Sequence, residues 1–596
     1  MRTLHAPLQV ERLEDRFTPA TFGVTWPDPQ HLTLSFAPTG ELATPTAQRE
    51  ALRAFQSWAV HANINFGLVA ATAPMSTDVR LGARPMGETT LAVSVPFDLA
   101  GSASGDVYLN SRQAFGGKGG FDLYTVLLQE AGHVLGVDNS PDPGSVMFDF
   151  YRGARSGLSA GDVAALQGLY GARLPDRFEG AAGNDTFATA AVLSHGRVAE
   201  GDLTTMADVD YYRVAVPEGA KDLTVNLRAS GVSLLQARVS VYDGDGRLVA
   251  TGAAGEPGGD VRLRVENATA GATYLVKVER GSDDVFGVGA YRLAVGPQAE
   301  SAGVTRQQTG PAEDGVQQLG VVAPAAGQLW EVNRRGSISG AGDEATYLLR
   351  TSEVAPAAML VSVASAGRFA PAVAVYDAAG RELPAQVLLD DGVTVNLQLV
   401  GAAANTDYFI RVTGRGGTEG GYRLAVDLRD APVVRDVLAA GPLGGRGQDA
   451  RMLQVSEDEL YHFALSGEAA GRVEGVTLRF TLHNAAGRVV FALTSLDGGL
   501  AAGDVWLPPG AYTVRVTAAT QDGAPAAVSY RLEGGARSDS IGLEPENTLT
   551  RPVTGTPPAS PAPAPAEATA DSTAYYFGIN LSFLLLTDPY SKPWYR

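Results

Sequence analysis

Residues 123–151 of this 596-residue chain read LYTVLLQEAGHVLGVDNSPDPGSVMFDFY. Asp122 is a good N-cap, and the sequence predicts a helix that runs from Asp122 through Val137. Gln129 and His133 are four residues apart, so they lie on one face of that helix. Side chains placed in this way can be directed at a single metal ion. The stretch therefore predicts a site built on one helix and the turn that follows it.

The residues around this pair extend the pattern. Glu130 is one residue along and can reach a metal-bound water as a general base. Gly136 lets the helix end and the chain turn back, which brings position 139 towards the same metal. The segment Ser145-Val146-Met147 follows. The whole stretch closely resembles the zinc-peptidase motif HExxHxxGxxH with its Met-turn, which is typical of metzincins, and it is most similar to the matrixins. By this resemblance Gly136 and Met147 are structural residues.

The resemblance extends over residues 20–172, because AFQSWA, GDVYLN and LSAGDVAALQGLYG are also similar to matrixin segments. It implies an α+β domain, α/β/α sandwich-like, of the metzincin type. Local patterns agree with a mixed fold: they predict helices at 47–60 and 159–170, the latter capped by Ser159 with Asp162, and strands at 78–82, 90–95 and 105–110.

This chain departs from the family pattern at two ligand positions. Position 129 is Gln and position 139 is Asn, where the motif has His, and neutral amides are weak ligands for zinc. His133 is the retained ligand, and Asp138 is a possible substitute for the third ligand after a slip of one residue. His31 and His61 are interpreted as surface or packing histidines. We therefore expect a pseudopeptidase. The resemblance to the family implies zinc as the cofactor. The alternative is an active zinc endopeptidase that hydrolyses extracellular proteins with Glu130 as general base.

Beyond residue 180 the pattern changes to short alternating strands separated by turns, and it repeats three times. Each unit has a strand, a turn with Gly-Arg, and a final Tyr-Arg-Leu. The glycine and the tyrosine are 45, 42 and 43 residues apart in Gly246–Tyr291, Gly380–Tyr422 and Gly487–Tyr530. This regularity predicts three homologous all-β sandwich modules, arranged as separate beads because the units are too long for a solenoid repeat.

The first of these modules contains NDTFATA (184–190) and DVDYYRV (208–214) and resembles the bacterial pre-peptidase C-terminal domain. That resemblance implies an accessory role in binding substrate or matrix, often with calcium. Possible oxygen ligands are Asp208, Asp210, Asp243 and Asp245. The alternative is that the DGDG segment is a tight hairpin turn and that Asp208 and Asp210 cap a strand.

Composition limits what else the chain can do. There are 46 Lys and Arg against 65 Asp and Glu, for a net charge of −19, which disfavours nucleic-acid binding. Cysteine is absent and histidine occurs seven times, so thiol chemistry and Cys-ligated metals are excluded. No run is long enough and apolar enough to predict a membrane span.

The expected organisation follows from these patterns. It comprises an N-terminal tag (1–19), the matrixin-like domain (20–172), a linker (173–180), three β-sandwich modules (181–297, 301–430 and 431–535), a Pro/Ala-rich linker (536–574) and an aromatic C-terminal tail (575–596). The tag lacks the apolar core of a secretory signal peptide, yet it resembles a segment at the start of large bacterial surface proteins. We expect a secreted or cell-surface bacterial protein whose partner is a peptide or an extracellular protein or matrix. The oligomeric state is left open.

Overall fold

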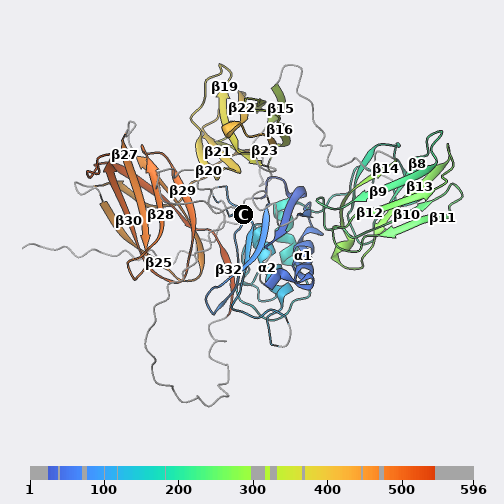
Figure 1. Ribbon diagram of the computed structural model, residues 1–596, viewed down its shortest axis with the longest axis horizontal. Helices are drawn as coiled ribbons and strands as arrows, with labels where there is room; N and C mark the ends of the chain where they lie inside the picture. The colour runs from blue at the N-terminus through green and yellow to red at the C-terminus, as the bar shows by residue number, and fades with distance from the viewer. Residues whose placement is uncertain are drawn as a thin grey trace, which may run out of the picture.

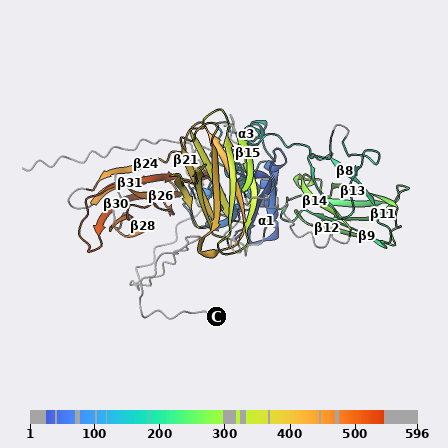
Figure 2. The same ribbon diagram turned by 90° about the horizontal axis from the view of Figure 1, so that it is seen from above.

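The computed structural model describes residues 25–543, with gaps at 38–40, 70–76, 100, 102, 117–118, 181–182, 297–315, 323–329, 331, 366–368, 444–447 and 469–474. The predicted N-terminal tag and aromatic tail lie outside the described residues. A helix-containing head stands at the centre, with one β-sandwich on each side and a third above it (Figure 1). Figure 2 shows that the sandwich drawn above the head in Figure 1, which contains β15 and β21, lies over the head in the view from above. Among the described residues, no helix has the length and apolar character to cross a membrane.

The head contains a six-stranded mixed sheet in the order β2-β1-β3-β5-β4-β32. Neighbours from β2 to β5 run parallel, whereas β4 is antiparallel to both β5 and β32. The strands are β1 (Leu32–Phe36), β2 (Phe66–Leu68), β3 (Val79–Arg84), β4 (Thr90–Ser94), β5 (Asp106–Asn110) and, far along the chain, β32 (Asp539–Gly542). The last of these lies within the range predicted as a Pro/Ala-rich linker, so ordered structure extends beyond residue 535.

Three α-helices belong to the head, α1 (Pro45–Ala59), α2 (Leu123–Val134) and α3 (Ala160–Tyr170), with short 3-10 turns at Pro29–His31 and Glu41–Ala43. Each begins at a residue with a capping side chain: Thr44 for α1, Asp122 for α2, and Ser159 in a capping box with Asp162 for α3. Helix α2 stops at Val134, three residues earlier than predicted, because Gly136 turns the chain with a φ of +83°.

The helices do not form the α/β/α arrangement that was expected. Helices α1 and α2 pack against each other, and the three helices contribute to the same apolar core. On β5 Val107 and Leu109 belong to that core, and Tyr108 points to the opposite face. There Tyr108 meets Trp506 of a sandwich at 5.4 Å between ring centroids. The sandwiches thus cover the sheet face on which a second helical layer was expected.

Module 1 consists of strands β6 to β14 in two sheets, β11-β10-β13-β8-β6 and β12-β9-β14-β7, around its own apolar core. Its strands are β6 (Ala191–Val192), β7 (Val198–Leu203), β8 (Val209–Ala215), β9 (Asp222–Arg228), β10 (Ala237–Tyr242), β11 (Leu248–Ala253), β12 (Val261–Glu266), β13 (Thr273–Arg280) and β14 (Gly289–Val295), with a 3-10 turn at Val285–Gly287.

Module 2 has the sheets β15-β17-β22-β19 and β16-β23-β18-β21-β20 around a separate core. Its strands are β15 (Val316–Val322), β16 (Val332–Ile338), β17 (Glu344–Thr351), β18 (Ala358–Ser365), β19 (Pro371–Asp377), β20 (Gln386–Asp390), β21 (Thr394–Val400), β22 (Asp407–Gly414) and β23 (Gly420–Arg429), with a 3-10 turn at Arg415–Gly417.

Module 3 repeats the plan with the sheets β24-β31-β26-β29 and β25-β30-β27-β28. Its strands are β24 (Val437–Pro442), β25 (Gln448–Val455), β26 (Glu459–Glu468), β27 (Val476–His483), β28 (Val489–Leu496), β29 (Ala501–Leu507), β30 (Gly510–Thr520) and β31 (Ser529–Ala536). The tyrosines of the repeated Tyr-Arg-Leu, which are Tyr291, Tyr422 and Tyr530, are all buried, on β14, β23 and β31 respectively.

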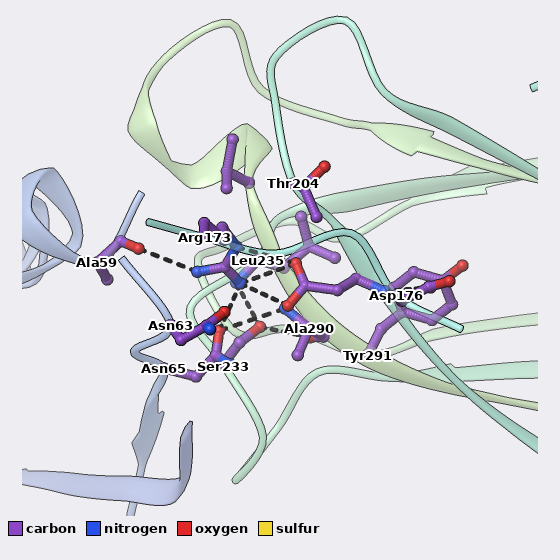
Figure 3. A network of polar contacts seen from close by, with 12 residues as sticks. Ala59, Asn63, Asn65, Arg173, Asp176, Thr204, Ser233, Leu235, Ala290 and Tyr291 are labelled. Atoms are coloured by element: carbon purple, nitrogen blue, oxygen red, sulfur yellow. Dashed lines mark hydrogen bonds and ion pairs between the residues drawn. The ribbon is translucent and has the colours of Figure 1, made fainter. Parts of the chain in front are cut away.

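The head is joined to module 1 by Arg173, which lies in the predicted linker (Figure 3). Its guanidinium donates to the carbonyl of Ala59 at 2.9 Å, to Asn65 Oδ1 at 2.8 Å, and to both carboxylate oxygens of Asp202 at 2.8 Å. The arginine side chain is only 4% exposed, so its bonds to head and module are shielded from water. This junction fixes the two units against each other.

Modules 2 and 3 contact other parts of the head. Arg335 of module 2 pairs with Asp28 of the head at 3.3 Å, and Arg423 forms an ion pair with Asp78. In module 3, Asp458 accepts from the backbone N–H of Gly87 at 2.5 Å. The three sandwiches have separate cores, as beads would, but each one is packed on the head.

Candidate active-site cleft and acidic cluster

Helix α2 places the motif residues inside the head. Gln129, Glu130 and His133 are all buried, because the helix is enclosed by α1, the sheet and the chain that follows it. The Nδ1 atom of His133 lies 3.1 Å from the carbonyl oxygen of Val137, which stands just after the turn at Gly136. A ring nitrogen of His133 is therefore engaged by the backbone of the same turn.

The segment predicted as a Met-turn packs against helix α2 beside the motif residues. Met147 is buried against the helix, and a Cβ on Gly132 would lie 2.4 Å from its sulfur, so a larger residue at position 132 would displace the Met147 side chain. The Ser145 hydroxyl donates to Asp162 at 2.5 Å, and this bond ties the segment to the capping box of α3. The scaffold around the motif is thus tightly packed.

Asn139, by contrast, is exposed and is engaged elsewhere. Its amide Nδ2 donates to Asp539 Oδ2 at 3.2 Å, and its backbone N–H donates to Asp138 Oδ1 at 2.7 Å. Burial raises the pKa of Asp138, the nearby Asp539 raises it further, and the Asn139 N–H and His133 oppose the rise.

These residues do not fit a catalytic zinc ion. The donor set is one imidazole and two amides, and the Nε2 atom of Gln129, a hydrogen-bond donor, is buried without a partner. Among the described residues, the groups of three or more His, Cys, Asp or Glu that lie close enough to hold a metal do not include His133 or Asp138. Catalytic zinc needs three good protein ligands and an open position.

Glu130 is fully buried beside the pair of ligand positions. Burial is the main cause that raises its pKa from 4.5 to about 8; the Ser94 hydroxyl and the Ile541 N–H oppose the rise, and the charge of Asp539 adds to it. Its Oε1 accepts from the backbone N–H of Ile541 at 3.3 Å. The carboxyl is therefore largely protonated at neutral pH, and a protonated carboxyl is not ready to act as a general base.

A second candidate site is a cluster of acidic side chains in module 1. Glu179, Asp208 and Asp210 place carboxylate oxygens within 4.8 Å of one another. Asp210 is buried and accepts from Tyr291 Oη at 2.5 Å, and its other oxygen has no partner. Asn184 is also fully buried, and its side chain lies beside Asp210, where it opposes the rise of that carboxyl's pKa.

Burial, together with the neighbouring carboxyls, raises the pKa of two acids of this cluster. The pKa of Asp210 is raised to about 8 by burial and by the charges of Asp176 and Asp208, against the hydrogen bonds from Tyr291 and Asn184. Burial and the charges of Asp208, Asp185 and Asp176 raise the pKa of Glu179 to about 7. A divalent cation would relieve this repulsion, and carboxylate and amide oxygens are the ligands that calcium prefers.

The two other aspartates predicted for calcium, Asp243 and Asp245, do not join this group. Asp243 Oδ1 accepts from the N–H groups of Asp245 and Arg247 at 3.0 and 2.9 Å, in an exposed hairpin turn between β10 and β11. The DGDG segment forms the hairpin turn that the alternative described, and a calcium role for these two aspartates stays a prediction. Sequence reasoning missed Glu179, which fell in the predicted linker, and Asn184, whose segment was recognised without assigning it a ligand role.

The remaining histidines near the head have ordinary roles. His31 pairs with Asp28 at 2.7 Å on the head surface. His61 follows α1, and burial lowers its pKa. Neither side chain lies in the motif site.

Comparison with known proteins supports the assignment of the head. The family profile described as matrixin matches residues 25–171. A probable matrix metalloproteinase of Invertebrate iridescent virus 3 is 36% identical over 77 residues, covering 12% of this chain and 21% of the viral protein. The hatching enzyme of Paracentrotus lividus is 27% identical over 164 residues, or 25% of this chain and 27% of that enzyme. Matrix metalloproteinase-25 of Homo sapiens is 29% identical over 159 residues, or 23% and 28%.

The chain therefore spans about a quarter of the length of these relatives. The fold, the motif and the matches agree on one point: residues 25–171 form a matrixin-like metallopeptidase domain.

Proposed function

We propose that this chain is an exported bacterial protein whose head is a pseudopeptidase, with a structural or peptide-binding role towards extracellular protein or matrix. The observation that supports this proposal most directly is the donor set at the motif, where Gln129 and Asn139 stand in place of imidazoles and Asn139 is bonded to Asp539. A protein that had lost catalysis but kept the fold would retain the buried Met147 and the packed helix, as this one does.

The proposal is tested on the purified full chain by elemental analysis after dialysis and by cleavage of casein. We expect less than about 0.1 zinc per chain and no cleavage above that of a Glu130→Ala variant. Glu88→Ala, at an exposed residue of the head, serves as the matched control. Stoichiometric zinc with cleavage that is lost in Glu130→Ala and kept in Glu88→Ala would overturn the proposal and favour the alternative.

That alternative is an active zinc endopeptidase acting on extracellular proteins, with Glu130 as general base. It is favoured by the retained pair Glu130 and His133 on α2 and by the packing of Met147 beneath the helix. The protonated state of Glu130 and the missing imidazoles count against it.

We further propose that module 1, a pre-peptidase C-terminal type domain, binds calcium through Glu179, Asp208 and Asp210. The carboxyl oxygens of Glu179 and Asp210 that are buried without a hydrogen-bond partner support the assignment, because a buried polar group without a partner is costly unless a ligand engages it. Export to the cell surface or medium, where calcium is abundant, agrees with such a site.

A further inference from the structure

Strand β32 reaches the head from the far end of the chain and forms the edge of its sheet, beside β4 and close to α2 (Figure 1). It follows directly on module 3, whose last strand β31 ends at Ala536. The segment Asp539–Leu543, named here the resident segment, therefore lies next to motif residues that precede it by some 400 positions in the sequence.

One side of the resident segment is paired with β4. The two strands run antiparallel, with Asp539 opposite Ser94 and Ile541 opposite Ala92. At the end of the pairing the N–H of Leu543 donates to the carbonyl of Thr89 at 2.8 Å. The resident segment covers a strand edge whose backbone groups would otherwise be open to pairing.

The other side is held by the chain that follows the Met-turn. The N–H of Gly542 donates to the carbonyl of Asp149 at 3.3 Å, and the N–H of Tyr151 donates to the carbonyl of Gly542 at 3.0 Å. Main-chain bonds on both sides define a slot, bounded by β4 and residues 149–151, that accepts an extended backbone.

Side chains give the slot its selectivity. Ile541 is 1% exposed and belongs to the head core, and Leu543 packs against the same core. Asp539 accepts from Asn139 at the slot entrance, and the Ile541 N–H donates to Glu130 at the slot floor. The residues at motif positions 130 and 139 thus contact a peptide strand directly.

We propose that this slot is a binding site for extended peptides, that the resident segment is its ligand in cis, and that a peptide from another molecule binds only when the resident segment has left. The preferred peptide has an acidic residue, then an aliphatic residue two positions later, then glycine. The inference rests on the proposed function in treating the head as a peptide-binding domain.

Module 3 is coupled to the slot through the same segment. Ser540 donates to Glu457 at 2.9 Å, and Arg537 forms an ion pair with Asp98 of the head. Release of the resident segment therefore breaks contacts of module 3 with the head, so occupation of the slot from outside and loosening of module 3 accompany each other.

The test uses the full chain and a fluorescein-labelled peptide, RSDSIGLEP, which has the sequence of residues 537–545. Fluorescence anisotropy is recorded with EDTA for the unchanged chain, for Ile541→Asp, which empties the slot by burying a charge, and for the conservative control Ile541→Val. We expect Ile541→Asp to bind at least about tenfold more tightly than the other two chains, because the resident segment no longer competes. A peptide with Asp in place of its isoleucine is expected not to bind.

Equal binding by the three chains, or no binding by folded Ile541→Asp, would overturn the proposal. If Ile541→Asp does not fold, hydrogen exchange of the unchanged chain decides. The amides of Ile541, Gly542 and Leu543 should be protected, and excess RSDSIGLEP should accelerate their exchange. Unprotected amides, or exchange that is unaffected by the peptide, would contradict the inference. Zinc content and casein cleavage do not enter this test, so it can fail while the pseudopeptidase proposal stands, and the reverse also holds.

Discussion

The motif site of the head and the acidic cluster of module 1 are opposite cases of a candidate cation site. In the head the spacing of a zinc motif is present, the helix is packed and capped, and the ligand chemistry is missing at positions 129 and 139. In module 1 the sequence offered Asp208 and Asp210 as possible ligands without a spaced motif, and the structure brings their carboxylate oxygens together with that of Glu179. The spacing of motif residues along the chain maintains the fold around a site. Metal binding depends instead on which donor atoms that fold brings together.

The two sites also differ in the groups that surround a buried carboxyl. Glu130 Oε1 accepts from a backbone N–H of the resident segment, its Oε2 is buried without a hydrogen-bond partner, and burial is the main cause of its raised pKa. Asp210 has one oxygen without a partner and further carboxyls beside it. Each site therefore buries a carboxyl oxygen without a partner, and they differ in that several further carboxyls surround Asp210, whose repulsion a cation would relieve.

Restoring the missing imidazoles at positions 129 and 139 should turn the head into a zinc site. The double variant Gln129→His and Asn139→His should bind zinc at least about a thousandfold more tightly than the unchanged chain, because two imidazoles join His133 on an intact scaffold. Competition with a chromogenic zinc chelator measures the affinity. Gln113→His, outside the motif, controls for adventitious binding. A folded double variant that takes up no zinc would show that the scaffold, too, has been lost.

The charge on Glu130 should make the stability of the chain depend on pH. Its pKa is about 8 in the folded chain against an ordinary 4.5, so the folded state binds more protons between these values and the chain loses stability as the pH rises from 4.5 through 8. At pH 8 the loss is about 4 kcal/mol.

Replacing Glu130 by Gln removes this loss and keeps an oxygen acceptor for the Ile541 N–H. Urea unfolding at pH 5 and pH 8 should show the variant gaining stability over the unchanged chain only at the higher pH. Glu88→Gln, at an exposed position, should keep the original pH dependence. A Glu130→Gln chain that is less stable at pH 8 would mean that the ionised carboxylate is required there, as catalysis would need.

For the acidic cluster, we expect calcium to stabilise module 1. Calcium at about 100 times its Kd should stabilise module 1 by about 2.7 kcal/mol, seen as a rise in its unfolding temperature. Asp210→Asn should abolish most of this rise, since it removes a ligand charge from the cluster. Asp243→Asn, in the exposed turn, should leave it unchanged. Equal calcium responses of the two variants would place the ion elsewhere.

Local sequence signals predicted the head well wherever a short segment decides its own structure. The capping residues Asp122 and Ser159 mark the starts of α2 and α3 because a side-chain oxygen meets orphan N–H groups within three residues. Helix α1 begins two residues earlier than its apolar spacing suggested, since Thr44 caps it and Pro45 suits the first turn. The hairpin at Asp243 likewise follows from local hydrogen bonds.

The matrixin-like helix and turn, the loss of two zinc ligands and the threefold β pattern can be read from the amino-acid sequence, because each depends on residue type and close spacing. Three other features are visible only in the folded chain: Glu179 joins Asp208 and Asp210, sandwiches cover the second face of the head sheet, and Asp539–Leu543 fills the slot beside Glu130. These are contacts between segments that are distant in the chain. Their geometry is set by how separate cores pack together, which no local periodicity records.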